Sequence, residues 1–147
     1  MTDERLAQLT QWFNDRPVLR ALGASCERLE PGRSHGALRV VSDFNNPNGA
    51  VPGTTLASFV DIVGGMAVST VSTSGEWFAT LHLGINYLRP AFGIEFTGQS
   101  DVVRRGRGHT WVRVDVFDDQ RRLCVAAEGT WAMMALPPGM PEPTPAI

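Results

Sequence analysis

The sequence contains few cysteines and no spaced set of metal-binding side chains. Two cysteines, Cys26 and Cys124, and three scattered histidines occur in 147 residues. CxxC, HExxH and GxGxxG motifs are all missing, so there is no signature of a zinc site, a metalloprotease or a dinucleotide-binding loop. Isolated thiols are typical of a reducing compartment. We therefore expect a cytoplasmic protein that needs no metal and no separate cofactor.

Excess basic charge and long apolar runs are also missing. The formal net charge is −2 and the pI is near 5.9, so no basic surface for nucleic acid is expected. The longest apolar stretch, residues 56–71, contains Asp61 and a glycine pair and is shorter than the ~20 residues of a membrane span. Acidic residues near the N-terminus argue against a signal peptide. Nucleic acid and membranes are therefore not expected partners.

Residues 46–71 are the stretch around which the chain is organised. Turn-forming Asn, Pro and Gly residues come first, and each favours a loop for its own steric reason. From Thr54 onward the sequence predicts a helix that is apolar on nearly every side, with Gly53 and Thr54 as candidate caps. A helix of this kind is surrounded by other structure. The rest of the domain is therefore expected to enclose it.

The segments after this helix alternate with a period of two residues, which predicts strands. They cover residues 80–88, 94–103, 110–117 and 123–135. Earlier strands are expected near residue 24 and over residues 34–41, and Leu6, Leu9 and Phe13 predict a short N-terminal helix. Short hairpin turns between neighbouring strands indicate an antiparallel sheet. The fold class is therefore α+β.

The length of 147 residues fits one domain with a substantial core. We divide it into an N-terminal helical segment (residues 1–22), a main domain (residues 23–136) and a tail (residues 137–147). The tail contains five prolines and is expected to be extended and mobile.

Asp61 is the one charge inside the apolar helix. Burying an unpaired carboxylate costs several kcal/mol or neutralises the group. Asp61 lies eight residues beyond Gly53, about 12 Å along a helix, too far for a capping or dipole role. A solvated edge or an arginine partner would also explain its position. We favour a catalytic role, because carboxylates in apolar clefts are common catalytic groups.

The start of the same helix offers a second chemical group. Free backbone N–H groups near Gly53 are suited to polarising a carbonyl oxygen. Asp61 of the same chain is too far away to act on that carbonyl. If both groups serve one site, Asp61 comes from a second subunit. The sequence thus indicates a symmetric homodimer with two active sites across its interface.

These residues resemble a known family, the hotdog-fold acyl-CoA thioesterases. The resemblance is strongest to the phenylacetate-degradation branch, which is related to the 4-hydroxybenzoyl-CoA thioesterases, and it spans about Leu22 to Met134. The residues that carry it are Asn46-x-x-Gly49-x-x-Pro52-Gly53, Asp61 in the apolar helix, and Thr80-x-x-x-x-Ile85-Asn86-Tyr87-Leu88-Arg89-Pro90. The resemblance implies a hotdog fold, an antiparallel sheet wrapped around a central apolar helix. It also implies edge-to-edge dimers that commonly pair into tetramers.

The resemblance implies a role for each matching residue. Gly53 matches the residue whose N–H polarises the thioester carbonyl, Asp61 the nucleophile or general base, and Asn46 the polar residue that orients the thioester or the water. The family usually has His-Gly-Gly where this chain has Pro52-Gly53-Thr54. Pro52 has no N–H and no donor side chain, so this difference is expected to change rate and substrate class more than the fold. Pro52 and Thr54 are candidate substrate contacts.

Arg104, Arg105 and Arg107 are candidate ligands of the CoA phosphates, since arginine forks fit phosphate oxygens. A solvated hairpin turn explains these arginines equally well.

His82 and Asn86 share one face of a predicted strand, whereas Leu81 and Leu83 share the other. His82 and Asn86 are therefore candidates for the border of the acyl pocket. A sheet face packed in an oligomer is the alternative.

The reaction that the resemblance implies is hydrolysis of an aryl or medium-chain acyl-CoA to a carboxylate and free CoA. A Gly-x-Ser-x-Gly elbow is missing, and Cys124 lies in a Val/Ala-rich strand where burial suppresses the thiolate. Two alternatives remain. One is a non-catalytic acyl-CoA-binding hotdog protein, which Pro52 makes plausible. A hotdog hydratase or dehydratase relies on an Asp–His pair, and the helix supplies no His near Asp61.

Overall fold

The computed structural model describes residues 1–41, 43 and 45–140. The chain forms α1 (Asp3–Asn14), α2 (Pro17–Leu22), β1 (Ala24–Glu30), β2 (Arg33–Arg39), α3 (Gly53–Ser69), β3 (Glu76–Tyr87), β4 (Glu95–Arg105), β5 (His109–Asp118) and β6 (Leu123–Ala135). The helices and strands predicted from periodicity are present, with ends that differ by up to about four residues. Part of the predicted mobile tail, residues 141–147, lies outside the described residues.

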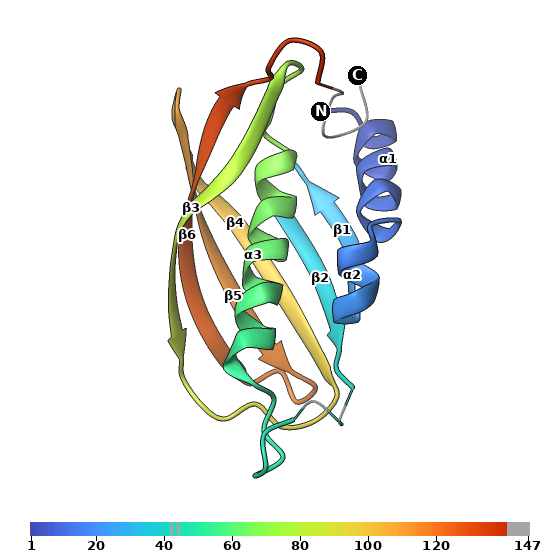
Figure 1. Ribbon diagram of the computed structural model, residues 1–147, viewed down its shortest axis with the longest axis vertical. Coiled ribbons are helices and arrows are strands. Elements are labelled where there is room, and N and C mark those ends of the chain that lie inside the picture. The colour runs from blue at the N-terminus through green and yellow to red at the C-terminus, as the bar shows by residue number, and fades with distance from the viewer. Residues whose placement is uncertain (42, 44, 141–147) are drawn as a thin grey trace.

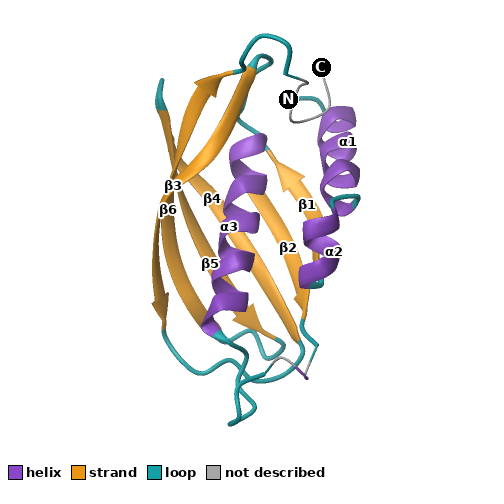
Figure 2. Cartoon of the chain, in the orientation of Figure 1, coloured by secondary structure: helices purple, strands orange, loops and turns teal. Residues whose placement is uncertain are grey.

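The six strands form one sheet in the order β1-β2-β4-β5-β6-β3, and every neighbouring pair is antiparallel. The helix α3 runs along one face of this sheet, while α1 and α2 lie to one side of it, next to β1 (Figure 1; Figure 2). The strands β1 and β3 are the two edges. The predicted arrangement, an antiparallel sheet around one apolar helix, is confirmed.

The core lies between α3 and the sheet. Phe59, Val60 and Val63 of α3 are fully buried, and burying each such side chain contributes about 1.5–3 kcal/mol. The helix begins at Gly53, and Pro52 occupies the cap position without a side-chain hydrogen bond. This corrects the expectation that Gly53 or Thr54 caps the helix. The φ of −59° at Pro52 matches the value that the proline ring imposes.

The edge strand β3 contains a bulge that changes which side chains face α3. Thr80 pairs with Trp131 and His82 with Thr130, so Leu81 is an extra residue without a partner on β6. The prediction that Leu81 and Leu83 share one face of the strand is wrong, because Leu81 is 58% exposed whereas Leu83 packs against the core. An extra residue reverses the alternation beyond it. Thr80 therefore points toward α3.

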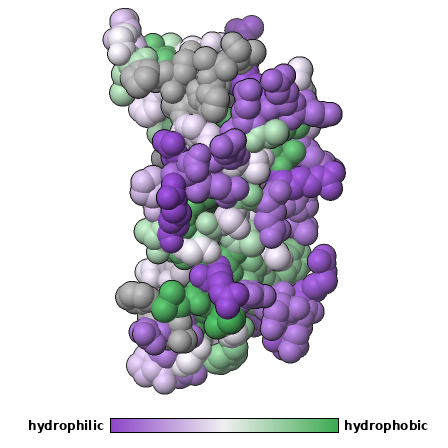
Figure 3. Space-filling model, turned by 90° about the vertical axis from the view of Figure 1, so that its right-hand side faces the viewer, coloured by the Kyte–Doolittle hydropathy of each residue, from purple (hydrophilic) through white to green (hydrophobic). Residues whose placement is uncertain are grey.

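The N-terminal helices are attached to β1. Leu9 and Phe13 of α1 are buried, and the Asn14 side chain both donates to the Cys26 carbonyl (3.0 Å) and accepts from the Cys26 N–H (2.8 Å). The face of the molecule that carries these helices is largely hydrophilic, and hydrophobic residues gather toward the end where α3 begins (Figure 3).

Within the described part of the chain, every helix is too short or too polar to cross a membrane.

Candidate active site

Asp61 lines a pocket of about 280 Å³ that lies between the N-terminal helices, α3 and β3. Most of the lining is apolar, and Asp61 is the carboxylate among the lining residues. The pocket is formed by Trp12, Phe13, Arg16, Val18, Leu19, Asp61, Ile62, Gly65, Phe78, Ala79, Thr80 and Trp131. Asp61 itself is half-buried. A mostly apolar pocket that contains a few polar groups is the usual form of a ligand-binding site.

The Asp61 carboxylate is held by one neighbour on β3. Thr80 Oγ1 donates a hydrogen bond to Asp61 Oδ1 at 2.7 Å. Asp61 takes part in no ion pair within the described residues, so an arginine partner does not explain its position there. Sequence reasoning missed the role of Thr80, because the alternation of β3 without its bulge places this side chain on the outer face.

The start of α3 presents free backbone donors. The N–H groups of Thr55 and Leu56 both donate to the Pro52 carbonyl, at 3.0 and 3.3 Å. The N–H groups of Gly53 and Thr54 have no acceptor among residues 1–41, 43 and 45–140. Because the first N–H groups of a helix lack intrahelical partners, this end of α3 can bind a carbonyl oxygen or an anion.

Tyr87 anchors this end of α3 to the end of β3. Its hydroxyl donates to the Gly53 carbonyl at 2.9 Å, and a Cβ on Gly53 would lie 3.2 Å from the Tyr87 ring. Pro52 and Thr54 line a second pocket here, of about 340 Å³. Gly53 and Asp61 lie on the same helix, about 12 Å apart along its axis, as the sequence required.

Asn46 lies in the turn before α3. Its N–H donates to the Ala50 carbonyl (2.9 Å) and its carbonyl accepts from the Gly49 N–H (2.7 Å). Gly49 has a φ of +80°, a conformation that glycine adopts without strain. The Asn46-x-x-Gly49 spacing thus has a structural cause, and the exposed Asn46 side chain does not reach the Asp61 pocket of its own chain.

His82 and Asn86 lie on the face of β3 that points away from α3. His82 is next to Gly84 and Glu128 on this face, and Asn86 lines a shallow surface site with Arg113, Asp115 and Glu128. Neither side chain lines the Asp61 pocket of its own chain. The alternative stated above, a sheet face packed in an oligomer, stays a prediction.

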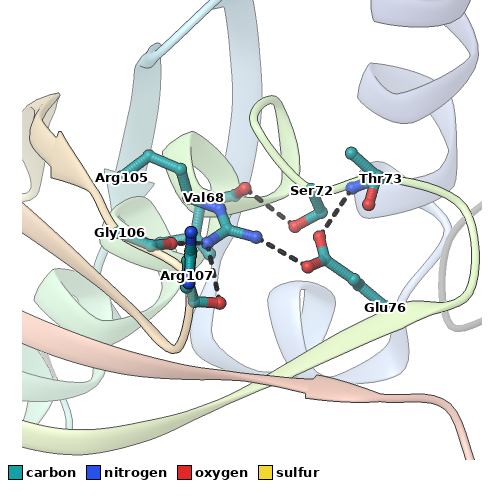
Figure 4. A network of polar contacts seen from close by, with 7 residues as sticks. All are labelled: Val68, Ser72, Thr73, Glu76, Arg105, Gly106 and Arg107. Carbon is teal, nitrogen blue, oxygen red and sulfur yellow. Dashed lines mark hydrogen bonds and ion pairs between the residues drawn. The ribbon is translucent and has the colours of Figure 1, made fainter.

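The three arginines near the β4–β5 hairpin have different surroundings. Figure 4 shows the polar contacts around Arg105. Arg105 pairs with Glu76 at 2.7 Å and donates to the Gly106 and Arg107 carbonyls. Burial alone would raise the pKa of Glu76, but hydrogen bonds from the Thr73 N–H and from Arg105 lower it below its usual value. Arg105 is therefore engaged within its own chain and connects the hairpin to β3.

Arg104 and Arg107 are exposed, and neither forms an ion pair within the described residues. They line a surface pocket of about 290 Å³ together with His109 and Trp111. Guanidinium groups beside an indole ring form a surface suited to a phosphorylated nucleotide. Trp111 was not among the predicted contacts, since its strand alternation indicates only an outer-face position.

The two cysteines are buried free thiols. Burial raises the pKa of Cys26 to about 11 and raises the pKa of Cys124 above its usual value. The prediction that burial suppresses the Cys124 thiolate is confirmed. Among the described residues, no three His, Cys, Asp or Glu side chains gather in a group that could hold a metal ion.

Comparison with known proteins shows which family this geometry belongs to. Residues 48–125 match the model of the thioesterase superfamily. A protein of Saccharolobus solfataricus named "Putative esterase" is 28% identical over 117 residues, which cover 80% of this chain and 83% of that protein.

Two solved structures share the fold. A thioesterase of Haemophilus influenzae has a TM-score of 0.81 at 19% identity and covers 92% of this chain and 94% of its own. A phenylacetic acid degradation-related protein of Ralstonia eutropha has a TM-score of 0.78 at 26% identity and covers 85% and 98%. The fold, the matched family stretch and the resemblance of the sequence agree, and the chain belongs to the thioesterase superfamily as a hotdog-fold thioester hydrolase.

Proposed function

We propose that this protein hydrolyses the CoA thioester of an aryl or medium-chain acyl group, releasing a carboxylate and free CoA. The observation that carries the proposal is the Asp61 carboxylate, half-buried in a largely apolar pocket and oriented by Thr80. One oxygen accepts the Thr80 hydrogen bond, and Oδ2 has no partner within the described residues. That oxygen is available for a water molecule or for the thioester carbon.

Two routes are consistent with this geometry. In one, Asp61 takes a proton from water, the hydroxide adds to the thioester carbon, and the C–S bond breaks with protonation of the departing CoA thiolate. In the other, Asp61 itself adds to the carbon, CoA leaves, and water hydrolyses the resulting anhydride. In both, the Gly53 N–H stabilises the developing oxyanion, a contribution of about 3–4 kcal/mol. Water is the only co-reactant, so no cofactor is required.

We propose that the active site is shared between two copies of the chain. Asp61 and Thr80 lie beside β3, an edge strand of the sheet, and Leu81 is exposed on that strand. A free edge is a ready template for pairing with another strand. A twofold axis at this edge reverses the direction of α3, which brings the partner's helix start toward Asp61.

The remaining candidates are assigned to substrate binding and assembly. Asn46, Pro52 and Thr54 at the start of α3 would contact the thioester and the pantetheine arm, as the resemblance implies. Arg104 and Arg107 would bind CoA phosphates, whereas Arg105 shapes the hairpin through Glu76. The outer sheet face would join two dimers into a tetramer, which places His82 and Asn86 in that contact. A cytoplasmic location stays a prediction.

The two alternatives differ in what they require of Asp61. A non-catalytic acyl-CoA-binding protein needs only the pocket, and Pro52 keeps that possibility open. A hydratase or dehydratase relies on an Asp–His pair, and no histidine is among the residues that line the Asp61 pocket. The geometry therefore favours hydrolysis over hydration.

Thiol release from a panel of acyl-CoA esters tests the proposal, with wild type compared with Asp61→Asn. We expect turnover in the wild type and a loss of about 100-fold or more in the variant, with substrate still bound. Binding without turnover in either protein would indicate an acyl-CoA-binding protein. Equal turnover in both would remove Asp61 from the reaction.

A further inference from the structure

Arg16 is a second charged residue in the Asp61 pocket, at the connection between α1 and α2. Its Nε donates to the Trp12 carbonyl at 3.1 Å, and its guanidinium carbon lies 4.6 Å from the centre of the Trp12 ring. These two contacts fix the plane and the direction of the guanidinium group. The side chain is half-buried.

The two terminal nitrogens of Arg16 are left free by these contacts. No hydrogen bond or ion pair to them occurs within residues 1–41, 43 and 45–140. The end of α1 and the indole ring favour a cation here, but neither uses these donors. A guanidinium held in one plane is ready to form two parallel hydrogen bonds to a carboxylate.

Two polar positions in the pocket thus belong to different elements. Asp61 and Thr80 belong to α3 and β3, and Arg16 belongs to the N-terminal segment. Apolar side chains such as Leu19, Ile62 and Phe78 line the space as well. A volume of about 280 Å³ accommodates a short acyl chain.

The wall that carries Arg16 lies outside the stretch that matches the thioesterase family. The match covers residues 48–125, which include Gly53, Asp61 and Thr80, whereas residues 12–19 of the pocket precede it. The reacting groups thus belong to the part of the chain common to the family. The part of the wall that carries Arg16 is supplied by the N-terminal segment.

We infer that Arg16 binds a carboxylate at the far end of the acyl group, so that the substrate class is the CoA monothioester of a short dicarboxylic acid. The inference rests on the proposed thioesterase reaction and assigns it this acyl group in place of an aryl or medium-chain one. The thioester carbonyl lies at Asp61, the methylene chain occupies the apolar part of the pocket, and the second carboxylate forms two hydrogen bonds with the terminal nitrogens of Arg16.

The test compares matched substrates. Succinyl-, glutaryl- and adipyl-CoA are each paired with the uncharged acyl-CoA of the same chain length. We expect the wild type to prefer at least one dicarboxylic member over its uncharged partner by about tenfold or more in kcat/KM. Arg16→Met should abolish that preference, with less than about threefold change for the uncharged substrates, and Arg16→Lys should retain part of it.

Arg20→Met is the matched control, because Arg20 is an exposed arginine of α2 that contacts Asp15 and does not line the pocket. It should leave the preference unchanged. Equal loss on charged and uncharged substrates in Arg16→Met, or no preference in the wild type, would overturn the inference while thioesterase activity stands.

Calorimetric binding separates this inference from the proposed reaction. The dicarboxylic acyl-CoA esters are titrated into Asp61→Asn and into Asp61→Asn with Arg16→Met. Tighter binding that depends on Arg16 would support the inference even if the wild type hydrolysed none of the esters, a result that would refute the proposed function alone. Equal affinity in the two proteins would overturn the inference.

Discussion

At the scale of single residues, the geometry of Asp61 depends on Thr80. Its hydroxyl donates to the carboxylate at 2.7 Å and is placed there by the bulge at Leu81. Thr80 acts through Asp61, which makes it a positioning residue. Hydrogen bonds to charged groups contribute about 1.5–3 kcal/mol, less where water competes.

Thr80→Val keeps the shape of the side chain and removes this hydrogen bond. We expect kcat to fall about tenfold with little change in KM, because the carboxylate loses its orientation and the substrate loses no contact. Thr80→Ser should recover most of the rate. Steady-state kinetics with thermal unfolding curves measures both effects, and a valine variant with wild-type kcat would contradict this role.

Asp118 is a second residue whose charge matters, here for stability at low pH. Burial alone would raise its pKa, but hydrogen bonds from the Arg122 and Gln120 N–H groups and the Arg122 guanidinium lower it. A carboxyl group with a lowered folded-state pKa stabilises the protein above its unfolded pKa of about 3.9. This stabilisation is lost as the pH falls through the folded-state pKa.

Asp118→Asn should therefore be less stable than wild type at pH 7, and the difference should shrink as the pH falls below about 4. Urea unfolding at pH 7 and pH 3 measures the two differences. Asp119→Asn, at the exposed neighbouring position, is the control and should show little effect at either pH. A constant difference for Asp118→Asn would show that its charge does not stabilise the fold.

At the scale of elements, α3 packs closely against Trp131 of β6. The Trp131 side chain is 1% exposed, and a Cβ on Gly64 of α3 would lie 2.4 Å from its ring. A Cβ on the next residue, Gly65, would lie 3.6 Å from Phe78, an ordinary contact. A side-chain methyl group therefore clashes at Gly64 but fits at Gly65.

Gly64→Ala should lower the free energy of unfolding by about 1–3 kcal/mol, because the new methyl group overlaps a side chain that cannot move away. Gly65→Ala should be neutral or stabilising by up to about 1 kcal/mol, because alanine favours the helix. Chemical unfolding of the two variants gives the comparison. Equal destabilisation would mean that the packing around Trp131 adapts.

At the scale of the whole molecule, the proposed shared site predicts complementation between two inactive variants. Gly53→Pro removes the N–H proposed to stabilise the oxyanion, at a first helical position where proline is favoured. Gly53→Ala adds a Cβ and keeps the N–H, so it is the matched control. We expect a loss of about 100-fold or more for proline and a much smaller loss for alanine.

Mixing subunits of Gly53→Pro and Asp61→Asn should then restore activity. Each mixed dimer has one site with an intact Gly53 and an intact Asp61, so equal mixing restores about one quarter of the wild-type sites. Thiol release after joint refolding measures the recovery. Activity no higher than the average of the two separate variants would refute a site shared between chains.

Hydrophobic patterns predicted the helices and strands, because each pattern depends only on residues close together in the sequence. Period-two alternation located β4, β5 and β6, and the continuous apolar run located α3. The charge of Asp61 stood out against that run without reference to any other element. The distance between Gly53 and Asp61 followed from helix geometry alone.

The sequence by itself determined the α+β elements, the apolar helix with Asp61 in it, and the separation of that carboxylate from the helix start. Tertiary structure decided the bulge at Leu81, because it depends on pairing with β6. It also decided the pairing of Arg105 with Glu76, 29 residues apart, and the position of Arg16 beside the Asp61 pocket. Each of these requires segments distant in sequence to meet, and no local periodicity records which segments will do so.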